Sequence, residues 1–315
     1  MCIRDRNISA LKILLKENGS RLAHQTLDGM NWKQVTYNDI YSNIEYINSY
    51  LTKNKIINRK VLSLTANCID SYVLECSLIN LGCSLNFASK SRLLDVQFNL
   101  DFDIILVDTI IDINDNHILQ NLTKNKIIIS IQNFKKTKES GSNSISLKNI
   151  YKIGLLSKKD TKIDKEIKIN LSKTISFLES NSIKTYTMED VNNFATKNES
   201  TFNIINENEF CASLYLKKDI FSKVLNLLFI KFKNKFTNNN SLNSFIENIN
   251  EIMPSNLIVD SVSLKELINI CYMNKIGFSE FTGSKIKKII TFELPDNENL
   301  ELIKKDGIEI ISLNS

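Results

Sequence analysis

Short apolar runs alternate with longer amphipathic stretches along most of this chain. Runs such as Val61–Leu64 and Phe210–Leu214 have the length and composition of buried strands. Between such runs, apolar residues recur at the spacing of one helix face, as Ile40, Ile44 and Ile47 do. Alternating strands and helices are typical of βαβ units, so the pattern predicts an α/β fold with mostly parallel sheets.

The same pattern places the individual elements. The predicted strands are Val61–Leu64, Cys83–Phe87, Asp103–Val107, Lys126–Ile131, Thr174–Leu178, Phe210–Leu214, Phe232–Phe236, Asn256–Val259, Ile286–Thr291 and Ile308–Ile311. The predicted helices are one capped by Asn38-Asp39 and running to about Leu51, then Ile69–Leu81, Leu93–Leu100, Met188–Lys197, Ile220–Phe229, Leu242–Ile252, Leu264–Met273 and Asn297–Lys305. Gly82 follows the second of these helices and suits its C-terminal cap.

Residues 133–170 interrupt the alternation. They are rich in Lys and Ser, with weak periodicity, and are predicted to form a polar linker between a first α/β lobe, residues 7–132, and a second, residues 171–315. The lysines there are a candidate basic patch, but interspersed Asp and Glu favour a solvated linker over a nucleic-acid surface. Residues 1–6 resemble translated sequencing adapter and are set aside.

Composition narrows the functional classes. The chain has 315 residues, 43% hydrophobic and 24% charged, with a net charge of +5 from 40 basic and 35 acidic groups. This mild imbalance predicts no nucleic-acid partner. Glycine (8) and proline (2) are scarce, since average usage gives roughly 22 and 16.

Membrane contact is limited to one candidate segment. The apolar stretch Ile8–Leu15 is short and interrupted by Lys12, and no run approaches the ~20 apolar residues of a membrane span. Phe221–Phe236 interleaves Phe, Leu and Lys, so peripheral membrane contact is one interpretation of it. A core helix running into a strand is the favoured one.

The residue types that carry chemistry are sparse. The six cysteines form no Cys-x-x-Cys pair, and the only histidines are His24 and His117. No metal site is predicted, and the cysteines are expected to be reduced core residues of a cytoplasmic protein. Both histidines lie in polar stretches and are expected at the surface, so no catalytic residue is predicted.

Three carboxylates flank one predicted strand. Asp101, Asp103 and Asp108 are in principle candidates for a metal site or an acid–base pair. Solvated loop carboxylates are far commoner and are the favoured interpretation.

Several segments in order resemble one enzyme family. The segment Gly29–Asp39 resembles a G-x-W-x-x-I/V/T-T-Y-x-E opening, and Val61–Asn67 resembles a V-A-I-x-x-x-N strand. The helix Asp70–Gly82 and the strand Phe102–Asp108 follow in the expected order, and Glu251–Leu257 resembles a later x-x-x-P-T-x-x strand entry. Together these segments resemble the N-terminal domain of adenylate-forming (AMP-binding) enzymes, most of all long-chain fatty-acid–CoA ligases.

The resemblance implies a fold and a reaction. The fold is the large N-terminal domain of acyl-CoA synthetases, with two mostly parallel βαβ lobes. The reaction is ATP-dependent activation of a carboxylate to an acyl-adenylate, followed by transfer to coenzyme A, with ATP, magnesium and coenzyme A bound. Ile286–Ile311 resembles the segment before the family's Y-G-x-T-E motif, so that motif and the C-terminal lid domain are expected to lie beyond Ser315.

The family's phosphate-binding loop is altered. A loop of the form S/T-S-G-S/T-S/T-G-x-P-K is expected after Thr174–Leu178, but Glu179–Thr187 is shorter and has neither glycine nor proline. Ser180, Ser182, Lys184 and Thr185 keep suitable atoms and are the candidate cofactor-binding residues. An ordinary polar strand-to-helix turn is the favoured interpretation, because a backbone cradle without glycine needs costly positive φ angles.

Two further motifs differ from the family. Thr291–Pro295 stands where a Gly-Gly-Ala turn would admit adenine, and Leu214–Lys218 stands in place of L-P-x-x-H. The chain is therefore expected to be a truncated or degenerate, inactive relative that uses no cofactor. One alternative is a pseudoenzyme that binds a fatty acid or an active ligase partner. Another is a working ligase completed by a second chain or by sequence beyond Ser315.

Overall fold

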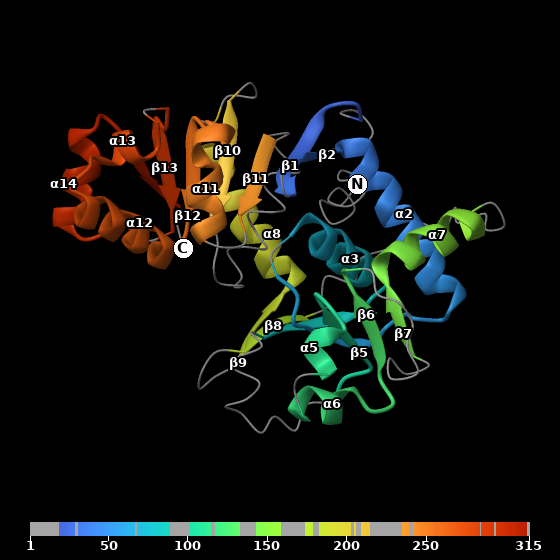
Figure 1. Cartoon of the computed structure of the whole chain (residues 1–315). Helices are drawn as coiled ribbons and strands as arrows, with labels where there is room; N and C mark the ends of the chain where they lie inside the picture. Colours follow the sequence, from blue (N-terminus) through green and yellow to red (C-terminus); the bar gives the residue numbers. More distant parts are fainter. Residues whose placement is uncertain are drawn as a thin grey trace.

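The part of the chain that the structure describes forms two seven-stranded sheets with helices around them (Figure 1). The structure is a computed structural model that describes residues 19–28, 31–66, 68–88, 101–114, 117–132, 143–158, 174–178, 183–202, 205, 209–214, 235–239, 242–283, 285–292 and 294–313. The α/β fold with parallel-rich sheets is thereby confirmed.

The first sheet has the strand order β7-β6-β5-β3-β4-β8-β9. Its pairings are parallel except for the β8–β9 hairpin at one edge. The strands are β3 (Lys60–Ser63), β4 (Ser84–Phe87), β5 (Ile104–Val107), β6 (Ile127–Ser130), β7 (Ser144–Ser146), β8 (Thr174–Leu178) and β9 (Ile183–Thr187).

The second sheet has the order β14-β13-β12-β10-β11-β1-β2. It is parallel except for the β1–β2 hairpin, again at an edge. The strands are β1 (Leu22–Asp28), β2 (Asn31–Thr36), β10 (Phe210–Leu214), β11 (Lys235–Asn239), β12 (Asn256–Val259), β13 (Lys288–Thr291) and β14 (Glu309–Ser312).

Helices cover both faces of the two sheets. They are α2 (Tyr37–Lys53), α3 (Ile69–Asn80), α5 (Ile111–Asn114), α6 (His117–Thr123), α7 (Leu147–Lys158), α8 (Met188–Lys197), α9 (Glu199–Phe202), α11 (Leu242–Ile252), α12 (Ser261–Asn274), α13 (Phe278–Phe281) and α14 (Asn297–Lys305). None of the helices in the described ranges is long and apolar enough to cross a bilayer.

The core follows from alternation along the strands. Neighbouring residues such as Val61 and Leu62 belong to different hydrophobic clusters, because successive side chains point to opposite faces of a sheet. One cluster, the shared core, joins α2, α3 and α8 to residues of both sheets, including Ile104 and Ile258. The other two lie on the outer faces, under α5 and α6 and under α11, α12 and α14.

Local sequence signals fixed many boundaries. The bounds of β8, α8, β10, α11, β12 and α14 agree with the predictions. Gly82 follows α3 with φ +77°, as its predicted capping role requires. The predicted helices Leu93–Leu100 and Ile220–Phe229 lie outside the described residues, as does most of the candidate membrane segment Phe221–Phe236.

The first helix is capped two residues earlier than predicted. Thr36, not Asn38 or Asp39, is its N-cap. The Thr36 hydroxyl accepts a hydrogen bond from the Asp39 backbone N–H at 3.2 Å, and the Asp39 carboxylate accepts one from the Thr36 N–H at 2.8 Å. This reciprocal capping box leaves Asp39 inside the helix.

The prediction of an unstructured linker is wrong for part of residues 133–170. Ser144–Ser146 form β7, and Leu147–Lys158 form α7, which packs along α2. The sheets also do not follow the expected division of the chain. The N-terminal strands β1 and β2 join the second sheet, and β8 and β9 join the first.

Candidate functional site

The β8–β9 hairpin occupies the place of the expected phosphate loop. Its antiparallel register ends at the pair Leu178 and Ile183, so only the four residues 179–182 connect the strands. Ser180 and Ser182 lie outside the described residues, whereas Lys184 and Thr185 are part of β9. The predicted strand-to-helix turn is wrong here, since a strand comes between the connection and α8.

The two described candidates lie on opposite faces of the hairpin. Side chains alternate along a strand, so Lys184 and Thr185 point in opposite directions. Lys184 is opposite Phe177, and Thr185 is opposite Ser176. The hydroxyls of Thr185 and Ser176 are 3.0 Å apart and hydrogen-bond to each other. This arrangement does not bring the lysine and the hydroxyl together around one phosphate group.

Aromatic packing holds the hairpin on the sheet. Phe177 stacks on Phe87 of β4 with a centroid distance of 5.1 Å, and Tyr186 meets Phe177 edge-on at 6.0 Å. After β9, Thr187 caps α8 through Asp190, whose carboxylate accepts from the Thr187 N–H at 2.7 Å and from its hydroxyl at 2.8 Å. The hydrogen bonds from Thr187 lower the pKa of Asp190.

The segment Thr291–Pro295, where the family's turn would admit adenine, is buried at both of its ends. Thr291 is the last residue of β13 and is buried, and Pro295 is also buried. The Ser312 hydroxyl donates to the Phe292 carbonyl at 3.3 Å. Of the third altered motif, Leu214 ends β10, and residues 215–218 lie outside the described residues.

The three carboxylates beside β5 each bind a different partner. Asp108 accepts from the Ala66 N–H at 2.9 Å. Asp103 accepts from the Lys60 N–H at 3.0 Å, and Asp101 forms an ion pair with Lys126 at 3.4 Å. Among the described residues, no three His, Cys, Asp or Glu side chains are grouped to hold a metal ion. These carboxylates tie strand ends to neighbouring backbone and lysine groups.

The prediction of surface histidines is wrong for His24. His24 lies on β1 and has no exposed surface, while His117 is exposed as expected. Burial, with Lys33 as a second cause, lowers the pKa of His24 to about 3, so it is neutral at physiological pH.

The buried cysteines agree with the expected core role. Cys83, Cys211 and Cys271 are buried, whereas Cys68 and Cys76 are only half-buried. Burial raises the pKa of Cys271 to about 11, and burial also raises that of Cys211. A thiol that stays protonated is a poor nucleophile.

The structure also contains a pocket that sequence reasoning missed. It has a volume of about 460 Å³. Residues from β2, α2, α3 and α7 and from the end of β6 line it: Lys33, Gln34, Val35, Asp39, Asn43, Ile69, Asp70, Val73, Ile131, Leu147, Lys148 and Tyr151. They come from four elements and from Ile131 just after β6, so no local spacing in the sequence marks them as neighbours.

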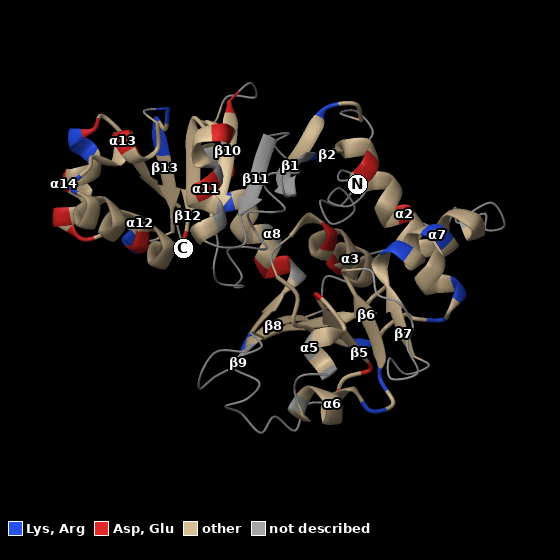
Figure 2. Cartoon of the chain, in the orientation of Figure 1, with Lys and Arg blue, Asp and Glu red and all other residues tan. Residues whose placement is uncertain are grey.

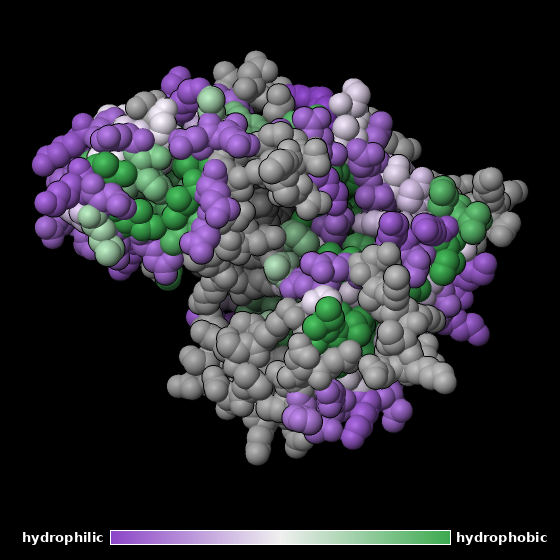
Figure 3. Space-filling model, in the orientation of Figure 1, coloured by the Kyte–Doolittle hydropathy of each residue, from purple (hydrophilic) through white to green (hydrophobic). Residues whose placement is uncertain are grey.

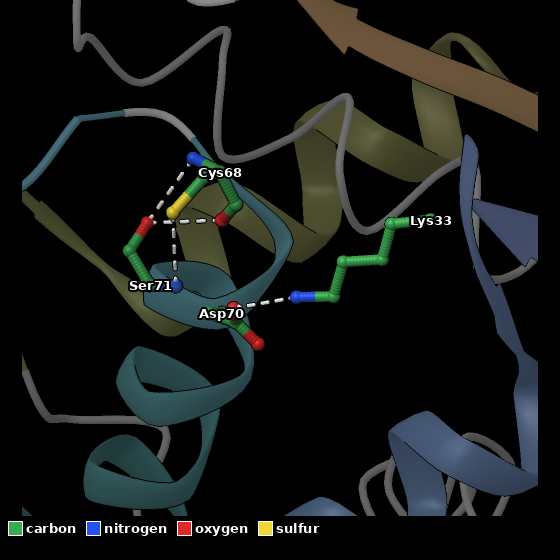
Figure 4. A network of polar contacts seen from close by, with 4 residues as sticks. All are labelled: Lys33, Cys68, Asp70 and Ser71. Carbon is green, nitrogen blue, oxygen red and sulfur yellow. Dashed lines mark hydrogen bonds and ion pairs between the residues drawn. The ribbon is translucent and has the colours of Figure 1, made fainter. Parts of the chain in front are cut away.

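An ion pair spans this pocket. Lys33 of β2 reaches the first turn of α3, where its ammonium group lies 3.1 Å from the Asp70 carboxylate (Figure 4). Beside Asp70, the Cys68 thiol and the Ser71 hydroxyl cap α3 reciprocally. The buried Tyr151 hydroxyl has no hydrogen-bond partner among the described residues, and burial raises its pKa, with Asp70 and Cys68 adding to the effect.

Comparison with solved structures places the fold. The A domain of carboxylic acid reductase from Segniliparus rugosus, in complex with AMP and a co-purified carboxylic acid, matches 95% of this chain and 58% of its own, with TM-score 0.71 and 10% identity. A luciferase-like enzyme from the nonluminescent mealworm Zophobas morio matches 95% of this chain and 70% of its own, with TM-score 0.67 and 14% identity. The chain has the adenylate-forming fold.

O-succinylbenzoate coenzyme A synthetase from Bacillus subtilis, in complex with AMP, is a third neighbour, with TM-score 0.62 and 12% identity over 95% of this chain and 71% of its own. No protein-family profile matches the chain. No curated protein sequence matches it either. At these identities, the likeness concerns the fold of the adenylate-forming enzymes.

Proposed function

We propose that this chain derives from a carboxylate-activating ligase, most like a long-chain fatty-acid–CoA ligase, and does not form acyl-adenylates itself. The observation that carries the proposal is the β8–β9 hairpin with its four-residue connection. The sequence segments that resemble the long-chain branch support the ancestry.

The steric argument concerns the triphosphate of ATP. Loops that bind phosphate point several backbone N–H groups at it, which requires glycine at positions of positive φ or close approach. The four connecting residues Glu179–Ser182 include no glycine. Lys184 and Thr185 lie on opposite faces of β9, so they do not compensate. The residues present do not fit ATP, and we expect no use of ATP, magnesium or coenzyme A.

Pyrophosphate exchange tests this proposal directly. The purified chain, given ATP, magnesium and palmitate, is expected to exchange labelled pyrophosphate into ATP no faster than a protein-free blank. Calorimetric titration with ATP is expected to give no binding heat. O-succinylbenzoate coenzyme A synthetase with its own substrate provides the positive control.

Exchange above the blank would contradict the proposal. The variant Lys184→Ala then decides where that activity resides. Activity lost in Lys184→Ala would identify the hairpin as a working phosphate site.

A second candidate function is that of a non-catalytic binding module. The continuous hydrophobic cores and the pocket between β2, α3 and α7 favour it. Its ligand is a fatty acid or an active ligase partner. Native mass spectrometry of the purified chain is expected to detect a bound acyl chain, or co-purification to recover a ligase. If neither a bound acyl chain nor a ligase is detected under gentle conditions, the result counts against this candidate.

A further inference from the structure

The outer face of α7 exposes large apolar side chains. Ile153 is 40% exposed, Leu155 48% and Leu156 68%. They form an apolar patch at the edge of the molecule over α7 (Figure 3). Burying such side chains is favourable, so a cluster of them on a surface helix marks an interaction site.

This face cannot turn inward, because α7 is held tightly on its other side. Leu147 and Ile150 are buried in the shared core. At Gly154 the helix approaches α2 so closely that a Cβ would overlap the Tyr46 carbonyl group. Lys53 at the end of α2 donates a hydrogen bond to the Ser157 hydroxyl at 3.4 Å. The apolar residues therefore lie on the face of α7 that is not packed on α2.

The charge on α7 is of one sign. The helix contains Lys148, Lys152 and Lys158 and no acidic residue (Figure 2). Lys148 and Lys152 are exposed and fall among the apolar residues at helical spacing. Two carboxylates line a pocket together with Lys148, and each has another partner: Asp39 binds Thr36, and Asp70 binds Lys33.

Charge complementarity selects the partner. A second copy docked symmetrically through α7 would bring the same lysines of both copies together, which is unfavourable. An anionic lipid surface instead offers headgroups to the lysines and acyl chains to the leucines and isoleucine.

We propose that α7 is a docking face for anionic membrane surfaces, with Ile153, Leu155 and Leu156 entering the interface and Lys148 and Lys152 binding headgroups. Contact is peripheral, since α7 stays packed on α2. The proposal is independent of whether the chain binds ATP.

Vesicle co-sedimentation tests it. The chain is expected to pellet with phosphatidylcholine vesicles containing phosphatidylserine, and much less with phosphatidylcholine alone. The charge variant Lys148→Gln/Lys152→Gln is expected to lower the partition coefficient about 25-fold, since each lysine near an anionic surface contributes roughly fivefold. The apolar variant Leu155→Ser/Leu156→Ser is expected to lower it at least about tenfold.

A matched control comes from α12. Its exposed apolar residues Val262 and Met273, 57% and 83% exposed, accompany both Lys265 and Glu266. The variant Val262→Ser/Met273→Ser is expected to bind vesicles like the parent chain. Circular dichroism melting curves check that all variants are folded.

Three outcomes would overturn the proposal. The first is no binding to anionic vesicles by the folded parent chain. The second is equal binding by the α7 variants and the parent. The third is dimerisation of the parent, measured by light scattering and lost in the α7 variants, which would assign the face to a second copy of the chain.

Discussion

At the scale of single residues, burial decides chemistry that residue type alone leaves open. His24 is a polar residue in a polar stretch, yet it has no exposed surface on β1, where it lies opposite the buried Val35 of β2. Aspartates are common metal ligands, yet Asp103 and Asp108 each accept a hydrogen bond from a backbone N–H of a neighbouring segment. Their role is to join the ends of β3 and β5.

His24 makes stability depend on pH. Its folded pKa, about 3, is below its unfolded value, so between pH 6.5 and 3 the unfolded chain binds a proton that the folded chain does not. The stability that His24 contributes is therefore fully present above pH 6.5. As the pH decreases below this value, the free energy of unfolding falls by at most about 1.4 kcal/mol per pH unit because of this group. Urea unfolding at pH 7 and pH 5 measures the loss.

The matched variants are His24→Gln and His117→Gln. Between pH 7 and pH 5, the free energy of unfolding of His24→Gln is expected to fall by about 1–2 kcal/mol less than that of the parent, because glutamine does not titrate. His117→Gln, at an exposed position, is expected to behave like the parent. An unchanged pH dependence in His24→Gln would show that other groups cause it.

At the scale of elements, the contact between α7 and α2 brings the region from 144 to 158 into the core. Gly154 permits that contact by its lack of a side chain. The helix buries Leu147 and Ile150 on the α2 side and leaves Ile153, Leu155 and Leu156 outside. One helix therefore contributes to the shared core and to the proposed membrane face at once.

Gly154→Ala tests the close approach. In an isolated helix, alanine would stabilise by about 1 kcal/mol relative to glycine. Here the added methyl group must push α7 from α2, which costs more than that gain, so a net loss of about 2 kcal/mol in the free energy of unfolding is expected. Urea denaturation measures it. Lys152→Ala, exposed on the same helix, is expected to change stability by less than about 0.5 kcal/mol.

At the scale of the whole molecule, the shared core couples the two sheets. Its residues come from both sheets and from α2, α3 and α8, so neither sheet has a core of its own on that side. The chain crosses between sheets more than once, since β1 and β2 precede the first sheet and β8 and β9 precede β10. The two sheets are expected to unfold together.

Calorimetry tests this coupling. The parent chain is expected to unfold in a single transition. Ile104→Ala in the first sheet and Ile258→Ala in the second should each lower the free energy of unfolding by about 2–5 kcal/mol, because each removes fully buried methyl groups from the shared core. In both variants the single transition should move to a lower temperature. A variant that splits the transition in two would show that the sheets fold separately.

The sequence by itself determined the α/β class and the bounds of elements such as β8, α8 and α14. It did so because period, caps and apolar runs are local signals: Thr187 caps α8 through a residue three positions away. It also showed the missing glycines of the phosphate loop.

Only the tertiary structure decided which sheet each strand joins, that Ile183–Thr187 is an edge strand, and that α7 packs on α2. A polar edge strand such as β9 has no buried face, so its sequence lacks the apolar pattern from which a strand is predicted. The burial of His24 and the pocket with Lys33, Asp70 and Tyr151 depend on residues that are distant in the chain, and the free energy of such contacts exists only once the layers have assembled.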